Sequence, residues 1–300
     1  MLENELVLVS CSSGLDSTCT LKILQLAGYE NLVVCHFRYG TRSDEAEFLA
    51  ITNICNHLNI PLKVFDVRNL YNEMEVESIS MLANENAKIV TGTKLGLKTT
   101  AAWHPMRNGL FQTIMMVFAE SEVMKHNYKK VYFCAGWNQL TESACYPDNT
   151  KYFSDACIGM AKYASLVGDR FSMLYCLANL MKTEQYVLAN HFKFLDLFDL
   201  CISCDRAKVV NGIPCNCAKD GIPACGSGLL SHWSEKMLGL KTNRNFYEVD
   251  DPDYVPHIPQ HLKDGFEKKP DINNIIDRIL LPPDRIEILK QKLKDVNNRD

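Results

Sequence analysis

The chain has 300 residues, of which 47% are hydrophobic and 23% are charged, and its formal net charge is −4. This is the composition of an ordinary globular protein that can bury a substantial core. No apolar run approaches the roughly 18 residues that a membrane helix needs, and no basic region followed by an apolar core marks a signal peptide. We therefore expect a cytoplasmic protein without a membrane partner. A nucleic-acid partner is not expected either, because such partners normally demand a basic surface.

Strand patterns and helix patterns alternate along the chain. Apolar, β-branched runs predict strands, and apolar residues at helical spacing predict helices. The predicted strands are residues 6–10, 31–37, 62–67 and 130–135, and the predicted helices are residues 17–26, 43–58, 108–125, 151–167 and 183–191. Strands separated by helices of this length indicate an α/β fold with a doubly wound parallel sheet. Such sheets bind ligands beyond the carboxyl ends of their strands.

The end of the first predicted strand carries the most informative motif. Residues 6–18 read Leu-Val-Leu-Val-Ser-Cys-Ser-Ser-Gly-Leu-Asp-Ser-Thr, which predicts a buried strand, a tight turn and a helix that begins near Asp16. The exposed N–H groups and the positive end of the helix dipole suit an anion, and the serine and threonine hydroxyls add donors. The motif is not a Walker A loop, because no Gly-Lys-Ser/Thr follows at the required spacing. The alternative is a serine-rich turn that only caps a helix.

The cysteines predict a metal site. The thirteen cysteines do not form an evenly spaced disulfide framework, and eight are scattered singly, where reduced cysteine behaves as a small hydrophobe. The other five crowd into one short region: Cys201, Cys204, Cys215, Cys217 and Cys225. Four thiolates can furnish a tetrahedral zinc site, which we expect to be structural. The alternatives are a redox Cys-x-x-Cys at residues 201–204 and free thiols.

The pattern along the chain suggests three parts. We predict an α/β domain at residues 1–198 that carries the motif of residues 6–18, a cysteine-rich zinc-binding subdomain at residues 199–240 and a C-terminal tail at residues 241–300 with short helices at 271–281 and 284–293. Helices this short are not stable alone, so they pack either on their own domain or across a dimer interface. The polar segment 69–106 is predicted to be a mobile loop over the active site, and the alternative is a disordered insertion.

Further landmarks follow one another in a particular order. They are Phe-Arg-Tyr-Gly-Thr-Arg at 37–42, His-Pro-Met-Arg-Asn-Gly-Leu-Phe at 104–111, Ala-Gly-Trp-Asn at 135–138, Tyr-Pro-Asp at 146–148 and Met-Lys-Thr-Glu at 181–184. Together with the first motif, which is similar to a Ser-Gly-Gly-x-Asp-Ser pyrophosphate loop, this order resembles the 7-cyano-7-deazaguanine synthase family of the N-type ATP pyrophosphatase (PP-loop) superfamily. The resemblance spans residues 6–235. The departures are Ser13 in place of the first glycine, the rearranged cysteines, Asn149 and Thr150 after Tyr-Pro-Asp, and the long tail after Leu240.

The resemblance implies an adenine nucleotide alpha hydrolase-like fold and a queuosine-pathway ligase. Such an enzyme uses ATP and Mg²⁺ to adenylate the carboxylate of 7-carboxy-7-deazaguanine, releases pyrophosphate, and passes the acyl group to ammonia to give the amide and then the nitrile. It also carries Zn²⁺ and is usually a homodimer. The departures leave three alternatives: a ligase that uses another amine such as a protein N-terminus, a tRNA-modifying PP-loop enzyme, and a non-catalytic zinc-stabilised partner subunit.

The resemblance also implies a set of site residues. The catalytic residues are Asp16, Ser17, Arg107 and Lys182. The ATP-binding residues are Ser10, Ser12, Ser13, Gly14, Leu15, Asp16, Ser17, Thr18, Arg42 and Asn108. The substrate-binding residues are Tyr39, Arg107, Asn138, Tyr146 and Asp148. The zinc ligands are four of the five clustered cysteines, with Cys225 as the substitute for one of the other four. Without the resemblance, Lys182 and Arg42 would be assigned to the surface.

Overall fold

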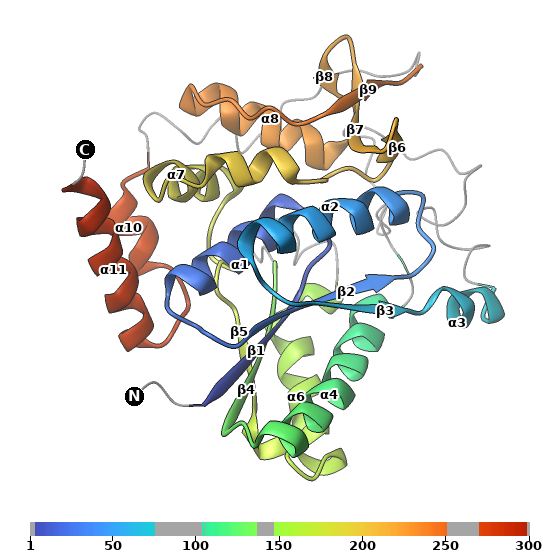
Figure 1. The fold of residues 1–300 in the computed structure, drawn as a ribbon, viewed down its shortest axis with the longest axis vertical. Helices are drawn as coiled ribbons and strands as arrows, with labels where there is room; N and C mark the ends of the chain where they lie inside the picture. Colours follow the sequence, from blue (N-terminus) through green and yellow to red (C-terminus); the bar gives the residue numbers. More distant parts are fainter. Residues whose placement is uncertain (1–3, 76–103, 105, 137–146, 251–269, 299–300) are drawn as a thin grey trace.

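A five-stranded parallel sheet forms the centre of the computed structural model, which describes residues 4–75, 104, 106–136, 147–250 and 270–298 (Figure 1). The strands are β1 Glu5–Ser10, β2 Leu32–Arg38, β3 Leu62–Asp66, β4 Lys130–Ala135 and β5 Phe171–Leu174. Their order is β3-β2-β1-β4-β5, and every neighbouring pair is parallel. The chain therefore reverses its direction of travel across the sheet between β1 and β4, which is a topological switch point. The predicted doubly wound α/β fold is confirmed.

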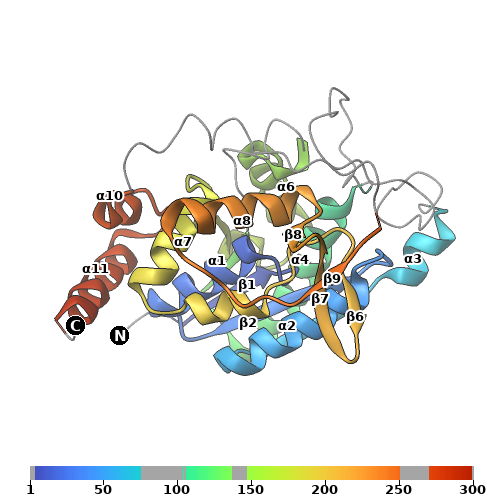
Figure 2. The same cartoon turned by 90° about the horizontal axis from the view of Figure 1, so that it is seen from above.

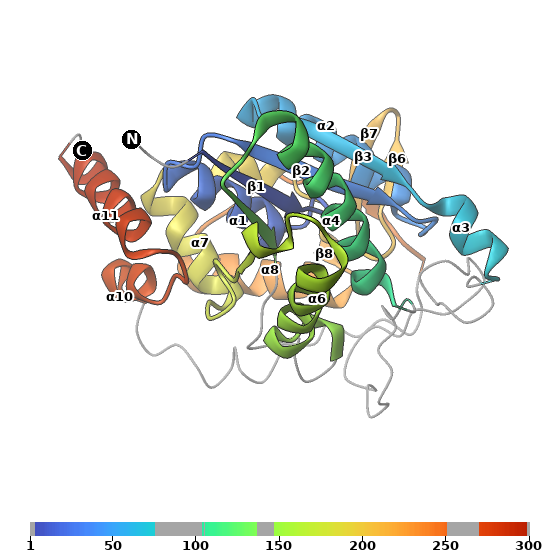
Figure 3. The same ribbon diagram turned by 90° about the horizontal axis from the view of Figure 1, so that it is seen from below.

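Helices cover both faces of the sheet (Figures 1 and 3). On one face lie α1 Leu15–Leu26, α2 Asp44–Leu58 and α7 Lys182–His191, and on the other lie α4 Arg107–His126 and α6 Lys151–Ala164, while α3 Arg68–Glu73 follows β3. Within β1, Val7 and Val9 belong to the core beside α1, whereas Leu6 and Leu8 belong to the core beside α4. Successive side chains of a strand point to opposite faces, so an uninterrupted apolar strand fills both cores.

A smaller sheet packs against α2 (Figures 1 and 2). Its elements are β6 Lys208–Val210, β7 Ile213–Lys219, β8 Ile222–Pro223 and β9 Phe246–Glu248, and α8 Gly226–Leu238 follows β8. Asn211 and Gly212 join β6 to β7 with φ of 50° and 78°, and Asp220 and Gly221 join β7 to β8 with φ of 52° and 72°. Two consecutive left-handed residues are typical of tight hairpin turns, and Asn-Gly and Asp-Gly favour them.

The tail helices pack on their own domain. They are α10 Ile272–Asp277 and α11 Pro283–Asn297. Ile275, Ile276 and Leu289 are fully buried in the same core as α1 and α7. Arg285 Nη2 pairs with Glu5 Oε2 at 2.7 Å, which ties α11 to β1. Of the two predicted arrangements, self-packing is the one that the described tail adopts. Within the described part of the chain, every helix is too short or too polar to span a membrane.

Short elements and element ends differ from the prediction. The predicted helix 151–167 ends at Ala164, and a single 3-10 turn, Gly168–Arg170, leads into β5. The helices α3 and α8, the strand β5 and the strands of the smaller sheet were not predicted. Apart from α8, these elements have two to seven residues each, and such short segments carry too little periodicity to be recognised without their partners.

Candidate active site

The loop after β1 is clamped between the sheet and the cysteine-rich segment. Ser13 has a φ of 66°, in the left-handed region that favours glycine, and α1 begins two residues later at Leu15. The Ser13 carbonyl accepts a hydrogen bond from the Ile202 N–H at 3.1 Å, and the Leu15 N–H donates to Ser203 Oγ at 2.9 Å. Ser13 therefore takes the conformation expected of the glycine that it replaces, and distant residues hold it there.

Gly136, at the end of β4, allows the loop to approach the sheet. A Cβ at this position would lie 2.4 Å from the Ser17 backbone nitrogen and 2.5 Å from the Ser17 Cα. Only a residue without a side chain fits so close to the first turn of α1. The sequence analysis did not include Gly136 among the site residues, although Gly136 lies in the Ala-Gly-Trp-Asn landmark.

Lys182 is buried against the loop. Its side chain is 7% exposed, and its ammonium forms an ion pair with Asp16 Oδ2. Gln185 Nε2 donates to Asp16 Oδ1 at 2.7 Å, so both carboxylate oxygens of Asp16 have partners on α7. The Met181 N–H donates to Glu184 Oε2 at 2.8 Å, which fixes the first turn of α7. A lysine that periodicity alone would assign to the surface thus lies beside the N-terminus of α1.

Arg107 and Asn108 are the first residues of α4, which lies on the face of the sheet opposite α1 and α7. Arg107 Nη1 donates to the Tyr39 hydroxyl at 3.4 Å. Burial raises the pKa of Tyr39 to about 12, so the phenol stays protonated at neutral pH. Asn108 Nδ2 donates to Asn149 Oδ1 at 2.7 Å, and Thr150 accepts from the Phe153 N–H as the N-cap of α6. Asn149 and Thr150, the two residues after Tyr-Pro-Asp, therefore each accept a hydrogen bond from a helix, Asn149 from α4 and Thr150 from α6.

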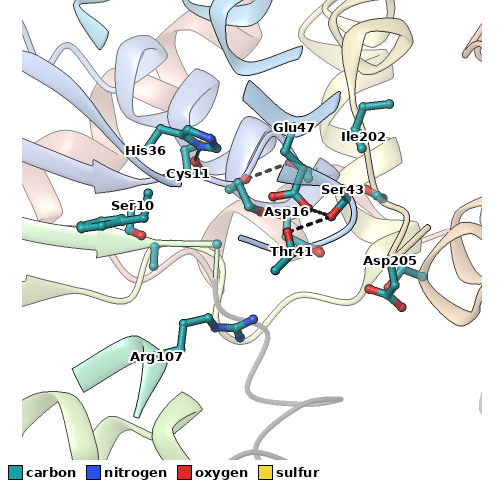
Figure 4. A pocket seen from close by; sticks show the side chains of 18 of the residues that line it. Ser10, Cys11, Asp16, His36, Thr41, Ser43, Glu47, Arg107, Ile202 and Asp205 are labelled. Carbon is teal, nitrogen blue, oxygen red and sulfur yellow. Dashed lines mark hydrogen bonds between the residues drawn. The ribbon is translucent and has the colours of Figure 1, made fainter. Parts of the chain in front are cut away.

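These groups face one cavity of about 300 Å³ (Figure 4). Of the predicted site residues, its lining includes Ser10, Ser12, Gly14, Asp16, Ser17, Tyr39, Arg107, Asn108, Lys182 and Cys204. Ser13, Leu15, Thr18, Arg42 and Asp148 are described but do not line it. Asn138, Tyr146 and most of segment 69–106 lie outside the described residues. Helix N-terminal amides and a buried lysine in one cavity form a donor set that fits a polyphosphate.

Two half-buried carboxyl groups in the cavity were missed by the sequence analysis. Glu47 lies on α2, and Asp205 follows Cys204. Burial raises the pKa of each carboxyl to about 7, and the nearby Arg107 opposes this rise in both. Glu47 falls within the predicted helix 43–58 and Asp205 follows Cys204, and neither carries a further signal in the sequence. Chain periodicity does not reveal which acidic residues face a cavity.

Three of the five clustered cysteines come together. Cys204, Cys217 and Cys225 form the group of candidate metal ligands found among the described residues, with ligand atoms within 4.8 Å of one another. Cys204 Sγ lies 3.2 Å from Cys217 Sγ. Hydrogen bonds from the Cys204 and Cys225 thiols lower the pKa of Cys217, which favours the thiolate, the form that binds metals. The three thiols fit zinc, for which sulfur is a preferred ligand.

The other two cysteines of the predicted set lie elsewhere. Cys201 is buried in the main core, and its thiol contacts the Leu197 carbonyl at 3.7 Å. The Cys215 thiol lies 3.4 Å from the Ile213 carbonyl of its own strand. Neither belongs to the three-thiol group. Sequence spacing favoured Cys201 with Cys204, but the tight β6–β7 and β7–β8 turns bring Cys217 to Cys204 and Cys225 instead.

A parallel sheet whose switch point carries this loop, a helix N-terminus and a buried lysine defines an α/β protein with a candidate anion site at the end of β1. The profile of the family described as "Queuosine biosynthesis protein QueC" matches residues 6–226, and the chain belongs to that family. The resemblance inferred from the order of the motifs is confirmed.

The individual relatives and the solved structure described next share 17–29% sequence identity with this chain. The chain is 29% identical to 7-cyano-7-deazaguanine synthase 2 of Sulfurisphaera tokodaii over 178 aligned residues. These residues make up 59% of this chain and 36% of that protein. It is 27% identical over 250 residues to the 7-cyano-7-deazaguanine synthase of Desulforamulus reducens, 81% of this chain and 98% of that protein. The chain thus spans about a third of the length of the first relative. The NH3-dependent NAD synthetase of Campylobacter jejuni aligns with a TM-score of 0.35 and 17% identity over 66% of this chain and 68% of that chain.

Proposed function

We propose that this chain is an ATP-dependent carbon–nitrogen ligase of the queuosine pathway that acts on 7-carboxy-7-deazaguanine. The observation that carries the proposal is the buried Lys182–Asp16 pair beside the start of α1, in a cavity that also contains Arg107. A cation at the positive end of a helix suits the phosphates of ATP. The names of the matched relatives support the substrate class.

In the proposed first stage, a carboxylate oxygen of the substrate attacks the α-phosphorus of ATP. The bond from the α-phosphorus to the bridging oxygen breaks, and pyrophosphate leaves with the electron pair. Ser17 and the first amides of α1 bind the phosphates, Lys182 neutralises the leaving pyrophosphate, and Asp16 holds Lys182 in place. Mg²⁺ supplies further charge neutralisation when it is bound with ATP, and Asp16 is its candidate ligand.

In the proposed second stage, ammonia attacks the acyl carbon and loses a proton while AMP leaves with the electron pair, which gives the amide. The amide oxygen then attacks the α-phosphorus of a second ATP and pyrophosphate leaves; this oxygen departs with AMP while both amide protons are lost, which gives the nitrile. Arg107 and Tyr39 bind the substrate, with the guanidinium toward its carboxylate. The acyl-adenylate must be kept from water, so the enclosed cavity suits this chemistry.

Zinc is proposed to have a structural role, with Cys204, Cys217 and Cys225 among its ligands. When bound there, zinc would link β7 and the start of α8 to segment 201–204. The same segment clamps the loop after β1 through Ile202 and Ser203. Loss of the zinc is therefore expected to destabilise the loop after β1 as well as the smaller sheet.

One assay tests the function. The full chain is incubated with ATP, Mg²⁺ and 7-carboxy-7-deazaguanine, with ammonium or with candidate partner proteins, and pyrophosphate and products are followed by mass spectrometry. Pyrophosphate release with the free amide or nitrile supports the proposal. Adenylation without an ammonia product, together with a mass increase on a protein amine, would show conjugation to a protein instead. Absence of pyrophosphate release would contradict ligase activity. Light scattering tests the homodimer that the family resemblance implies.

A further inference from the structure

Two carboxyl groups in the cavity have no role in the proposed adenylation. Glu47 enters it from α2 and Asp205 from the segment after Cys204, and both line the cavity together with Arg107 (Figure 4). Ser43 Oγ donates to Glu47 Oε1 at 2.6 Å, which fixes the position of that carboxyl. A buried acceptor that lacks a donor costs free energy. Two carboxyl groups that face one cavity therefore suit a ligand rich in hydrogen-bond donors.

His36 provides an independent observation in the same cavity. Its side chain is 2% exposed and lines the cavity, and its Nδ1 lies 3.0 Å from the Cys11 carbonyl. A carbonyl only accepts, so Nδ1 carries the proton, and burial lowers the pKa of His36 and keeps the ring neutral. His36 Nε2 is then an acceptor, and it is buried without a hydrogen-bond partner among the described residues. An unpartnered buried acceptor in a cavity points to a donor on a ligand.

We propose that Glu47, Asp205 and His36 Nε2 form the subsite that recognises the N–H edge of a guanine-type base. This inference rests on the proposed function. A 7-deazaguanine presents N1–H, a 2-amino group and N9–H as donors, and one carboxylate can accept from N1–H and the 2-amino group together. Adenine lacks both N1–H and the 2-amino group. The subsite therefore distinguishes the base of the substrate from the base of ATP.

Calorimetric titration of the full chain tests the subsite with two probes. One is 7-carboxy-7-deazaguanine, and the other is the same compound without its 2-amino group, 7-carboxy-7-deazahypoxanthine. Wild type is expected to prefer the first probe. Glu47→Gln and Asp205→Asn are each expected to weaken binding of the first probe about tenfold and to reduce the preference, because a charge-assisted hydrogen bond becomes a neutral one. ATP affinity is expected to stay unchanged.

Glu45→Gln is the matched control, since Glu45 lies on the same helix with its side chain 69% exposed and should alter neither affinity. Zinc content is measured in each variant, because Asp205 adjoins Cys204. If wild type binds the first probe and both variants bind it equally well, the subsite is wrong and the proposed function stands. If the variants weaken ATP to the same extent as the probe, the carboxyls serve the nucleotide and the subsite is also wrong. If wild type binds neither deazapurine, the proposed substrate fails and the subsite fails with it.

Discussion

Replacing Gly136 with alanine tests whether the close approach of β4 to the loop is essential. The new Cβ would lie 2.4 Å from the Ser17 nitrogen and 2.5 Å from the Ser17 Cα. Both are backbone atoms of the first turn of α1, so rotation of a side chain cannot relieve the contact and the turn must move. Overpacking a tight site costs about 1–3 kcal/mol, and we expect a loss of about 3 kcal/mol in the free energy of unfolding because backbone must shift.

Urea denaturation of the full chain measures this loss, and Gly159→Ala is the matched control. A Cβ at Gly159 meets nothing within 4 Å, and Gly159 lies inside α6. Alanine is therefore expected to stabilise the chain there by about 0.5–1 kcal/mol. Displacement of Ser17 in the Gly136→Ala variant is also expected to lower pyrophosphate release at least about 100-fold, since catalysis depends on position. If the Gly136→Ala variant matches wild type in stability and activity, the reasoning is refuted.

Three further outcomes are expected. Lys182→Met is expected to lower kcat for pyrophosphate release by about 10²–10³-fold. Lys151→Met is the control, because Lys151 is 60% exposed in an ion pair on α6, and it should leave kcat unchanged. If both variants have the same kcat, Lys182 has no part in the mechanism. Metal analysis finds about one zinc per chain, Cys217→Ser lowers both zinc content and melting temperature, and Cys215→Ser lowers neither. The pKa of Glu47 is about 7 in the folded chain, above its value of about 4.3 in an unfolded one, so its contribution to stability is greatest below pH 4 and is lost as pH rises through 7. Relative to Glu47→Gln, the free energy of unfolding of wild type should therefore fall by up to about 3 kcal/mol between pH 4 and pH 8, and parallel pH profiles would contradict this.

Much of the main domain was predictable because its signals are local. Residues 6–10 form a strand and residues 17–26 lie in a helix, as predicted, since runs of apolar β-branched residues and helical spacing depend on near neighbours alone. The same holds for the tail, where the prolines at 282 and 283 separate two amphipathic segments. Which arrangement the tail takes depends on the partner of its apolar face, and the packing of Ile275, Ile276 and Leu289 beside α1 and α7 decides that.

The clustered cysteines show the opposite case. Five cysteines within 25 positions predicted a metal site but not its members, because the two hairpin turns around β7 determine which thiols meet. Cys201 and Cys204 are neighbours in sequence, yet Cys201 faces the main core and Cys204 faces the smaller sheet. Spacing along a chain constrains ligands within one turn, whereas ligands on separate strands are brought together by folding.

By itself, the amino-acid sequence determined the parallel α/β architecture, the strand–turn–helix junction at the end of β1 and the family, because strand, turn and helix preferences and the order of motifs are properties of the chain. Only the tertiary structure decided that Lys182 is buried against Asp16, 166 positions away, and that Gly136 must lack a side chain. It also placed Glu47 and Asp205 in one cavity. The physical reason is that burial and charge pairing depend on which elements pack together, and packing joins residues that the sequence keeps far apart.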